Sequence, residues 1–518
     1  MAQAVRQAYA SGEEDEALEP LVLVDDHGRP IGRIRNGDYV IFYDIRGERE
    51  VELTSSFVDE GFQEFPTKRG LKVNFVTMIQ YHENLNVTVA FPPPRKIEGT
   101  LSQVISEHGL RQVKIVESEK AIHLEFFLNG KRDEPWPGEE RIVIPSPGIE
   151  RYDQTPEMAI AQVTAAVLEK MDDERYDLLI ANFANVDVVG HIENEEAIKR
   201  AVETVDTNIG LVVEAALKAN MTVLVTADHG TVEKWLYPDG AIDTGHTDSP
   251  VPCIFIGPQG SRLREGGELR DVAPTILQLL GLPKPPAMTG SSLLEDGPPI
   301  GPDRRRILLL IVDGWGFREE TEGNLIAQAN TPVMDRLQQE YPFTTLKASG
   351  KAVGMPDGTV GNSEAGHLHL GAGRRIYSDR LRIDEALEDR SFFKNEAFLW
   401  AMKGARKDGT QLHLLGIVSF YSSHGSVDHL LALLELAKRE GLKEVYIHSM
   451  LGRRGEHPES GARYIQTVEE ATERLGLGKV ASVIGRFWAL DREENWDRIE
   501  KTYRWLVCGE GKAVRGVT

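Results

Sequence analysis

This sequence has few cysteines. It lacks long apolar runs and a segment typical of a signal peptide at its start. Its 518 residues include two cysteines, Cys253 and Cys508, and Cys253 lies in an apolar run typical of a buried strand. This argues against a disulfide framework of the kind that small secreted domains use. No apolar stretch approaches the length of a membrane span, and residues 1–10 lack the apolar core of a signal peptide. We therefore expect a soluble protein that works in a reducing cytoplasm.

Basic residues are also fewer than acidic residues. Lysine and arginine number 59 against 81 aspartates and glutamates, which gives a formal net charge of -22. This excess argues against nucleic acid or an anionic membrane as partner, although a local basic pocket for a small anion is compatible with it. With 41% hydrophobic and 27% charged residues, the chain is typical of globular proteins, and its length predicts two domains. We expect a monomer.

Helix and strand patterns alternate clearly along two parts of the chain. From residue 156 to 280 the alternation predicts a mostly parallel sheet covered on both faces, and the pattern restarts at residue 412 as a second α/β unit. The triple proline at 92–94 is stiff and cannot continue a central strand, so it predicts a domain crossing. The Gly/Pro-rich stretch at about 294–304 has the composition of a linker.

Aspartate and histidine side chains follow apolar, strand-like runs at several separate places. Ligands gather beyond the carboxyl ends of parallel strands, so these distant residues can converge. Any one of them alone is more simply a satisfied polar group at a strand end. Together, Asp and His without Cys suit Mn, Zn or Mg, and the set is large enough for two ions. The candidate ligands are Asp187, His191, Asp228, His229, His246, Asp313 and Ser363.

Ser363 is the candidate nucleophile. Gly361 and Asn362 allow an irregular backbone just before it, and residues 364–368 can open a helix whose unpaired N–H groups favour an anion beside the hydroxyl. Gly-Asn-Ser is also ordinary turn chemistry, so the stretch alone decides little. With two metal ions nearby, the serine oxygen could be activated and a phosphoryl group neutralised during in-line transfer.

Three cationic residues lie at the exits of predicted strands. Arg46 and Arg49 are three residues apart, and such a pair can bind one phosphate or carboxylate through both guanidinium groups. Lys120 follows another strand and is a candidate phosphate ligand. For each of these residues a solvated surface position is the more usual explanation.

Stretches spread over nearly the whole chain resemble motifs of the cofactor-independent (2,3-bisphosphoglycerate-independent) phosphoglycerate mutases, within the alkaline-phosphatase superfamily. They are Asp313-Gly314-Trp315-Gly316, Gly361-Asn362-Ser363-Glu364, 182–191, Thr226-Ala227-Asp228-His229-Gly230, Gly485-Arg486 with Asp491-Arg492, Arg46 with Arg49, and Glu117-Ser118-Glu119-Lys120. In the family the Asp-Gly-Trp-Gly stretch lies near the amino terminus and the Asp-His-Gly stretch near the carboxyl terminus. Here the latter comes first, so the resemblance implies a circular permutation, which is tolerated where the original termini lie close together.

The resemblance implies an α/β fold with an alkaline-phosphatase-like doubly wound sheet domain and a second α/β substrate domain. In the permuted order the phosphatase-like metal and nucleophile domain covers 95–377, with the internal linker at about 294–304. The substrate-binding transferase domain is then split between 1–94 and 378–518.

The resemblance also implies roles for single residues. One ion binds Asp187, His191 and His246; the other binds Asp313, Ser363, Asp228 and His229. The ions are most readily Mn²⁺, with Zn²⁺ or Mg²⁺ as alternatives. Ser363 takes the phosphoryl group and returns it to the other hydroxyl of a retained glycerate, which converts 3-phosphoglycerate to 2-phosphoglycerate in glycolysis. The implied substrate clamp is His424, Arg454, Arg486, Arg492, Arg46, Arg49 and Lys120.

Two departures from the family concern the substrate side. Gly452-Arg453-Arg454-Gly455 stands where the family has Asp-Gly-Arg-Asp, and the stretch 419–426 lacks the family's Asp-Gly-Gly and second histidine. Proton transfer to the acceptor hydroxyl and recognition of glycerate each lose a group. Two alternatives therefore stay open: the same phosphoserine chemistry on another small phosphorylated or phosphonate acid, and a phosphohydrolase. A non-catalytic metal- or ligand-binding protein is a third.

Overall fold

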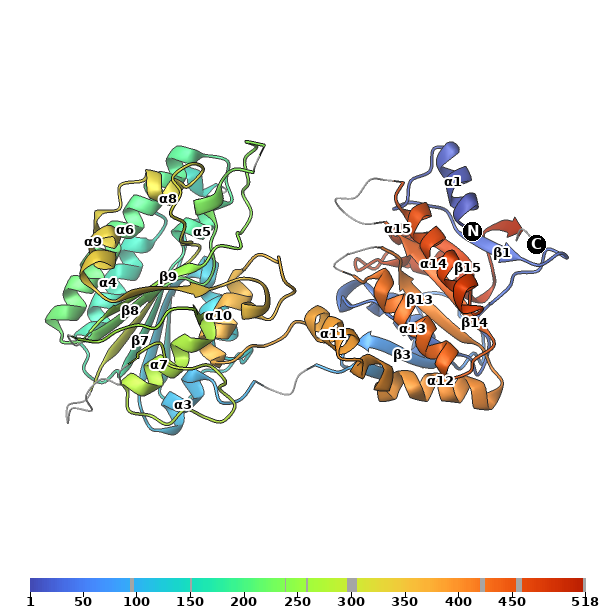
Figure 1. Ribbon diagram of the computed structural model, residues 1–518, viewed down its shortest axis with the longest axis horizontal. Helices are drawn as coiled ribbons and strands as arrows, with labels where there is room; N and C mark the ends of the chain where they lie inside the picture. The colour runs from blue at the N-terminus through green and yellow to red at the C-terminus, as the bar shows by residue number, and fades with distance from the viewer. Residues whose placement is uncertain are drawn as a thin grey trace. The chain divides into compact units, whose positions relative to one another are not determined.

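The computed structural model divides into two compact units, Met1–Pro93 with Arg382–Thr518 (unit 1) and Pro94–Leu381 (unit 2). Each unit has its own eight-stranded sheet and its own hydrophobic core, so the predicted α/β class is confirmed (Figure 1). The structure describes residues 1–93, 97–149, 151–237, 239–257, 260–295, 305–419, 424–452 and 459–515. Arg454 and most of the predicted linker lie outside these residues. Neither cysteine forms a disulfide.

The sheet of unit 2 has the strand order β10-β12-β9-β8-β11-β7-β5-β6. Its strands are β5 (Gln112–Glu117), β6 (Glu139–Ile144), β7 (Leu178–Phe183), β8 (Thr222–Thr226), β9 (Val251–Ile256), β10 (Gly267–Glu268), β11 (Ile307–Val312) and β12 (Phe343–Lys347). The five from β8 to β6 pair in parallel, while β9 is antiparallel to both of its neighbours. Strands β7, β8 and β11 are buried along their whole length, which suits a sheet covered on both faces.

Two groups of helices cover this sheet (Figure 1). The first contains α4 (Ile160–Met171), α5 (Asn185–Gly190), α6 (Glu195–Lys218), α8 (Leu325–Gln328) and α9 (Pro332–Glu340), all in contact with one another through α6. The second contains α3 (Leu101–Glu107), α7 (Val272–Leu279) and α10 (Ser363–Ala372), which contact one another. Helix α6 begins at the N-cap Asn194, whose side chain accepts from Ala197 N, and its apolar residues recur at helical spacing.

Unit 1 repeats the layered plan with the strand order β16-β1-β15-β14-β13-β2-β3-β4. The strands are β1 (Leu21–Val24), β2 (Tyr39–Phe42), β3 (Asn74–Ile79), β4 (Thr88–Phe91), β13 (Leu412–Ile417), β14 (Val445–Leu451), β15 (Lys479–Gly485) and β16 (Lys512–Arg515). The helices are α1 (Ala2–Ala10), α2 (Val51–Val58), α12 (Glu396–Asp408), α13 (Val427–Arg439), α14 (Gly461–Leu475), α15 (Arg486–Ala489) and α16 (Trp496–Val507). Helix α11 (Asp379–Glu388) crosses the division between the units. Among the described residues, no helix is both long and apolar enough to pass through a membrane.

A buried chain of polar side chains crosses the sheet of unit 1. Asp38 Oδ2 lies 3.1 Å from His413 Nε2, and His413 Nδ1 lies 3.0 Å from His448 Nε2. His448 Nδ1 in turn lies 2.8 Å from Ser482 Oγ. Burial lowers the pKa of His413, more than the Asp38 carboxylate raises it, and burial lowers the pKa of His448 well below its usual value. The folded protein therefore holds both rings neutral.

The two buried histidines of this polar row predict that the stability of the protein depends on pH. Below about pH 6.5 the unfolded chain takes up protons at the two imidazoles while the folded protein does not, so the free energy of unfolding should fall as the pH is lowered from there. Each histidine contributes a slope of at most about 1.4 kcal/mol per pH unit. Urea unfolding at several pH values should show a shallower slope for His448→Gln than for the native chain. The exposed His82→Gln is the control, and equal slopes for the native chain and His448→Gln would contradict the assignment.

Candidate metal centre

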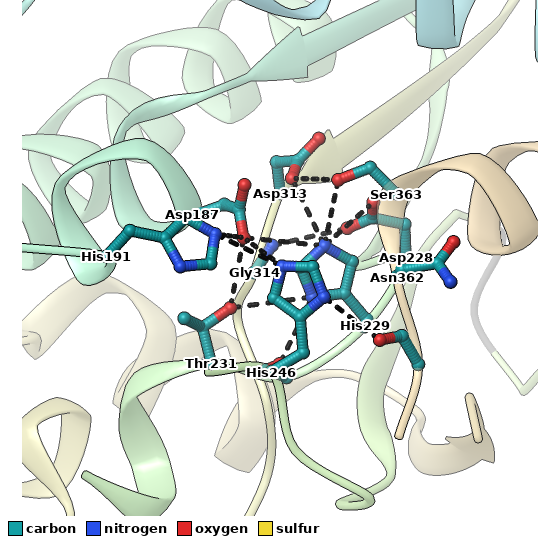
Figure 2. Close-up of polar contacts among 12 residues, drawn as sticks. Asp187, His191, Asp228, His229, Thr231, His246, Asp313, Gly314, Asn362 and Ser363 are labelled. Atoms are coloured by element: carbon teal, nitrogen blue, oxygen red, sulfur yellow. Dashed lines mark hydrogen bonds and ion pairs between the residues drawn. The ribbon is translucent and has the colours of Figure 1, made fainter. Parts of the chain in front are cut away.

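The predicted ligands of unit 2 come together at the carboxyl ends of three neighbouring strands (Figure 2). Asp313 directly follows β11, and Asp228 and His229 follow β8. Asp187 lies in the first turn of α5, just beyond β7. Val312 is paired with Phe183, and Ile311 with Thr226, so the three strands end side by side and deliver these side chains to one place.

Ser363 is the first residue of α10 and points into this group of side chains (Figure 2). Its Oγ lies 3.0 Å from His229 Nε2 and donates to Asp313 Oδ1 at 3.3 Å. Lys120 Nζ donates to Ser363 Oγ at 2.7 Å. The Asn362 side chain caps α10 by accepting from Ala365 N at 2.8 Å. The serine hydroxyl thus lies at the N-terminus of a capped helix among charged groups, where an anion is favoured.

Three glycines allow the backbone to pack this closely. A Cβ at Gly361 would come within 2.3 Å of the Ala348 carbonyl oxygen, and one at Gly366 within 2.5 Å of the Asp228 carbonyl oxygen. The sequence suggested that Gly361 serves an irregular backbone, but close approach of the loop to its neighbours is the stronger requirement. Gly314, with φ of 79°, lies against the Asp187 backbone in the same way. Its N–H donates to Asp228 Oδ1 at 3.2 Å.

The first ligand group is built around Asp187. Its Oδ1 lies 3.2 Å from His246 Nε2, 3.4 Å from His191 Nε2 and 3.5 Å from His229 Nε2. His246 Nε2 and His191 Nε2 are 3.2 Å apart. Thr231 Oγ1 donates to Asp187 Oδ1 at 3.2 Å, as Figure 2 shows. Several nitrogens therefore face one carboxylate oxygen, the arrangement expected of side chains that share a cation.

The second ligand group joins Asp313, Ser363 and Asp228. His229 Nε2 lies 3.5 Å from Asp228 Oδ2 and 3.6 Å from Asp313 Oδ1, so His229 contacts both groups. Asp228 Oδ2 is buried and makes no hydrogen bond to any described residue. A buried carboxylate oxygen that accepts no hydrogen bond, close to imidazole nitrogens, fits a divalent metal ion.

Lys120 lies among these carboxylates. Its Nζ is 2.5 Å from Asp187 Oδ2 and 2.9 Å from Asp313 Oδ1. Burial alone would lower the pKa of Lys120, but Asp313 and Asp187 raise it, so the side chain carries its charge. Lys120 in turn holds the pKa of Asp313 below its usual value although burial acts to raise it. In this structure Lys120 supplies positive charge to both ligand groups.

Side chains beyond the predicted set support the centre. His367 Nδ1 lies 2.9 Å from the Ser363 carbonyl oxygen and 3.2 Å from Asp228 Oδ2. Asn182 Nδ2 donates to Asp313 Oδ2 at 2.8 Å and lies 3.0 Å from His367 Nε2. His367 was not among the ligand candidates, although its position four residues after Ser363 on one helix face was an available signal.

Three of the predicted anion-binding residues of unit 1, Arg46, Arg49 and Arg492, lie on two chain segments that contact each other. Arg46 Nη2 and Arg492 Nη1 both contact Glu48 Oε2, at 3.4 Å and 2.7 Å. Arg49 Nη1 donates to the Leu490 carbonyl oxygen at 3.0 Å, which ties the same two segments together. Arg486, on α15, is largely buried. Arg454, Gly455 and residues 420–423 lie outside the described residues.

His424, another predicted clamp residue, is buried in unit 1. Its Nδ1 lies 2.8 Å from Glu50 Oε1. Burial lowers the pKa of His424 to about 4, and burial raises the pKa of Glu50 to about 8.

Comparison with known proteins gives two family matches. Residues 33–284 match the Metalloenzyme superfamily, and residues 383–517 match the BPG-independent PGAM N-terminus. The chain is similar to "2,3-bisphosphoglycerate-independent phosphoglycerate mutase 2" of Methanosarcina acetivorans, with 43% identity over 292 residues that cover 56% of each chain. It is also similar to the "2,3-bisphosphoglycerate-independent phosphoglycerate mutase" of Desulforudis audaxviator, with 46% identity over 298 residues that cover 57% of each.

A crystal structure of Leishmania mexicana phosphoglycerate mutase at low cobalt concentration matches 52% of this chain and 53% of its own, with 28% identity and a TM-score of 0.36. The alignments thus span a little more than half the length of the curated relatives. Residues 33–284 are thus similar to the Metalloenzyme superfamily, and residues 383–517 to the N-terminal region of the BPG-independent phosphoglycerate mutases.

Proposed function

We propose that the protein is a metal-dependent phosphoglycerate mutase that converts 3-phosphoglycerate to 2-phosphoglycerate through a phosphoserine at Ser363. The main support is the position of Ser363 Oγ, which contacts His229, Asp313 and Lys120 at 2.7 to 3.3 Å within a buried group of carboxylates and imidazoles. The family matches and the curated relatives point to the same reaction.

Two ions are proposed for unit 2. One binds Asp187, His191 and His246, and the other binds Asp313, Ser363, Asp228 and His229, with Mn²⁺ the preferred ion and Zn²⁺ or Mg²⁺ alternatives. Bound ions supply Lewis-acid activation of the serine oxygen and neutralise phosphoryl charge. The donor set of carboxylates and imidazoles without thiolate supports this assignment.

The side chains around Ser363 have separate tasks in this mechanism. Ser363 Oγ forms a bond to phosphorus as the bond from phosphorus to the substrate oxygen breaks, and the serine proton passes to that departing oxygen. In the reverse step the other hydroxyl takes the phosphoryl group and its proton returns to Ser363 Oγ. Lys120 Nζ, 2.7 Å from Ser363 Oγ, can contact the oxygens of the transferred group. The N–H groups at the start of α10 favour its negative charge. Asn362 and Gly361 fix the position of the serine.

The substrate's carboxylate and hydroxyls are assigned to unit 1. The proposed clamp residues of unit 1 are His424, Arg46, Arg49, Arg454, Arg486 and Arg492, and Lys120 is a proposed phosphate ligand in unit 2. The contacts of Arg46 and Arg492 with Glu48 support this, since one carboxylate holds both guanidinium groups. Guanidinium groups recognise carboxylate and phosphate with two parallel hydrogen bonds.

We further propose a circularly permuted domain order. The metal and nucleophile domain covers 95–377, with a linker at about 294–304, and the transferase domain combines 1–94 with 378–518. The match to a family region named for an N-terminus lies at residues 383–517, after the metalloenzyme match, which supports this order. The acidic net charge and two cysteines support a cytoplasmic protein that binds no nucleic acid or membrane. We propose that it acts as a monomer.

A direct assay tests this function. With Mn²⁺ present, the protein should convert 3-phosphoglycerate to 2-phosphoglycerate, measured by coupling the product to enolase. Treatment with a chelator should remove the activity, and added Mn²⁺ should restore it, because the proposed transfer needs bound divalent ions. No isomer at any metal concentration would contradict the assignment.

The sequence at 452–455 favours an alternative substrate or an alternative reaction. Because Gly455 replaces an expected carboxylate, the acceptor hydroxyl lacks one partner. The same phosphoserine chemistry would then act on another small phosphorylated or phosphonate acid, or release phosphate as a hydrolase. Inorganic phosphate formed in amounts equal to the substrate consumed would distinguish hydrolysis from isomerisation.

A further inference from the structure

Unit 1 contains a cluster of two carboxylates and an imidazole that the proposed mechanism leaves largely unexplained. Asp44 follows β2, Glu50 immediately precedes α2, and His424 lies shortly before α13. One ligand atom from each lies within 4.8 Å of the others. The same spacing is found in unit 2 for Asp187 with His229 and His246. The cluster is completely enclosed, since Asp44 and Glu50 are each 0% exposed and His424 is 1% exposed.

The contacts of the three side chains leave coordinating capacity inside the cluster. Asp44 Oδ1 accepts from Ile417 N at 2.7 Å, and Glu50 Oε2 accepts from Arg49 N at 3.1 Å. Glu50 Oε1 faces His424 Nδ1 at 2.8 Å. Asp44 Oδ2 is buried and accepts no hydrogen bond from any described residue. A fully buried carboxylate oxygen without a donor points to a missing partner.

The two carboxyl groups also lack a lysine or arginine partner within the described parts of the chain, and burial raises the pKa of both. By contrast, the exposed Glu48 between them contacts both Arg46 and Arg492. In unit 2, Lys120 forms ion pairs with the buried Asp187 and Asp313. Burying carboxylates without a cation is costly, so either a proton or a bound cation must balance them.

The backbone leaves room for this arrangement. A Cβ at Gly416 would lie 2.6 Å from Asp44 Oδ1, and one at Gly425 would lie 3.5 Å from the same oxygen. The glycine at 416 therefore allows strand β13 to run directly against the carboxylate.

We propose that Asp44, Glu50 and His424 bind a divalent cation in unit 1, separate from the metal centre of unit 2. Two carboxylates and one imidazole, without thiolate, suit Mn²⁺ or Zn²⁺. The ion ties residues 44–50, which carry Arg46 and Arg49, to the segment that begins α13. The site rests on contacts within unit 1 alone, and in it His424 binds the ion, which leaves the clamp to the arginines of unit 1.

The test counts metal in a full-length protein whose unit 2 centre is disabled. The background variant Asp187→Asn/Asp313→Asn is stripped with a chelator, equilibrated with Mn²⁺ or Zn²⁺, freed of excess metal and measured by elemental analysis. We expect one equivalent of metal per chain to stay bound, and we expect it to be lost when Asp44→Asn/Glu50→Gln is added. Glu52→Gln, on the same α2 segment but outside the cluster, is the matched control and should keep the equivalent.

Each result decides the proposal. If the background variant binds no metal while its circular dichroism is native, the site does not exist and a shared proton balances the two carboxyls. If metal binds but the Asp44→Asn/Glu50→Gln change leaves the count unaltered, the ligand assignment is wrong. Should the background variant fail to fold, the same comparison is made in the native chain, where Asp44→Asn/Glu50→Gln must lower the count by one equivalent.

Discussion

Ser363→Ala should abolish phosphoryl transfer, with kcat falling by at least about 10⁴-fold, because losing a covalent nucleophile removes the step that splits the transfer in two. The variant keeps the helix cap, since Asn362 and not Ser363 accepts from Ala365 N. The fold and the carboxylate groups should therefore survive the change. The measurement is the coupled mutase assay at saturating 3-phosphoglycerate and Mn²⁺.

A nearby serine provides the control for this variant. Ser349 lies in the same domain, and its Oγ donates to the Asp248 carbonyl oxygen at 2.9 Å without contacting the ligand groups. Ser349→Ala should keep nearly full activity. A Ser363→Ala protein that retains more than about a tenth of the native rate would show that another group accepts the phosphoryl.

Lys120→Met should strongly destabilise the metal-free protein. Lys120 Nζ contacts Asp187 and Asp313 at 2.5 and 2.9 Å, and methionine keeps most of the side-chain volume without the charge. Removing one partner of a buried ion pair typically costs about 3–5 kcal/mol of unfolding free energy. Because Asp187 and Asp313 raise the pKa of Lys120, the lysine is charged across the neutral range and the loss should not depend on pH there. Urea unfolding of chelator-treated protein measures the effect.

Metal ions should reverse most of this loss. Divalent cations bound to the same carboxylates replace the missing charge, so Lys120→Met should be stabilised more by Mn²⁺ than the native protein is. Lys234→Met is the control, because Lys234 pairs with Asp248 at a partly exposed position and should change stability by less than about 1 kcal/mol. Equal stability of native and Lys120→Met proteins without metal would contradict the charge balance described for this centre.

Much of the metal centre followed from local patterns in the sequence. The strands β7, β8 and β11 are continuous apolar runs, and parallel strands deliver the residues that follow them to one edge. Asp313 directly follows β11, Asp228 lies just after β8 and Asp187 lies in the first turn of α5 beyond β7, so their convergence could be predicted. The two-domain organisation was likewise readable from the restart of the α/β pattern.

Other parts of the structure depend on contacts that no local pattern encodes. Lys120 was predicted as a substrate ligand, and its ion pairs with Asp187 and Asp313 arise only when β5 packs beside β7. Glu50 and His424 are 374 residues apart, so nothing in the sequence joins them. Strand β3 begins at Asn74 because its partner β2 begins at Tyr39, which pairs with Asn74.

The most direct test of the account is to locate the transferred phosphoryl group. Native protein is mixed with 3-phosphoglycerate carrying a labelled phosphate, quenched with acid during turnover, digested and examined by mass spectrometry. We predict label on the peptide that contains Ser363, at that hydroxyl, and none in the Ser363→Ala protein. Turnover with the label on a different side chain, or with no label on the protein at any quench time, would contradict the proposal that this serine carries the phosphoryl group.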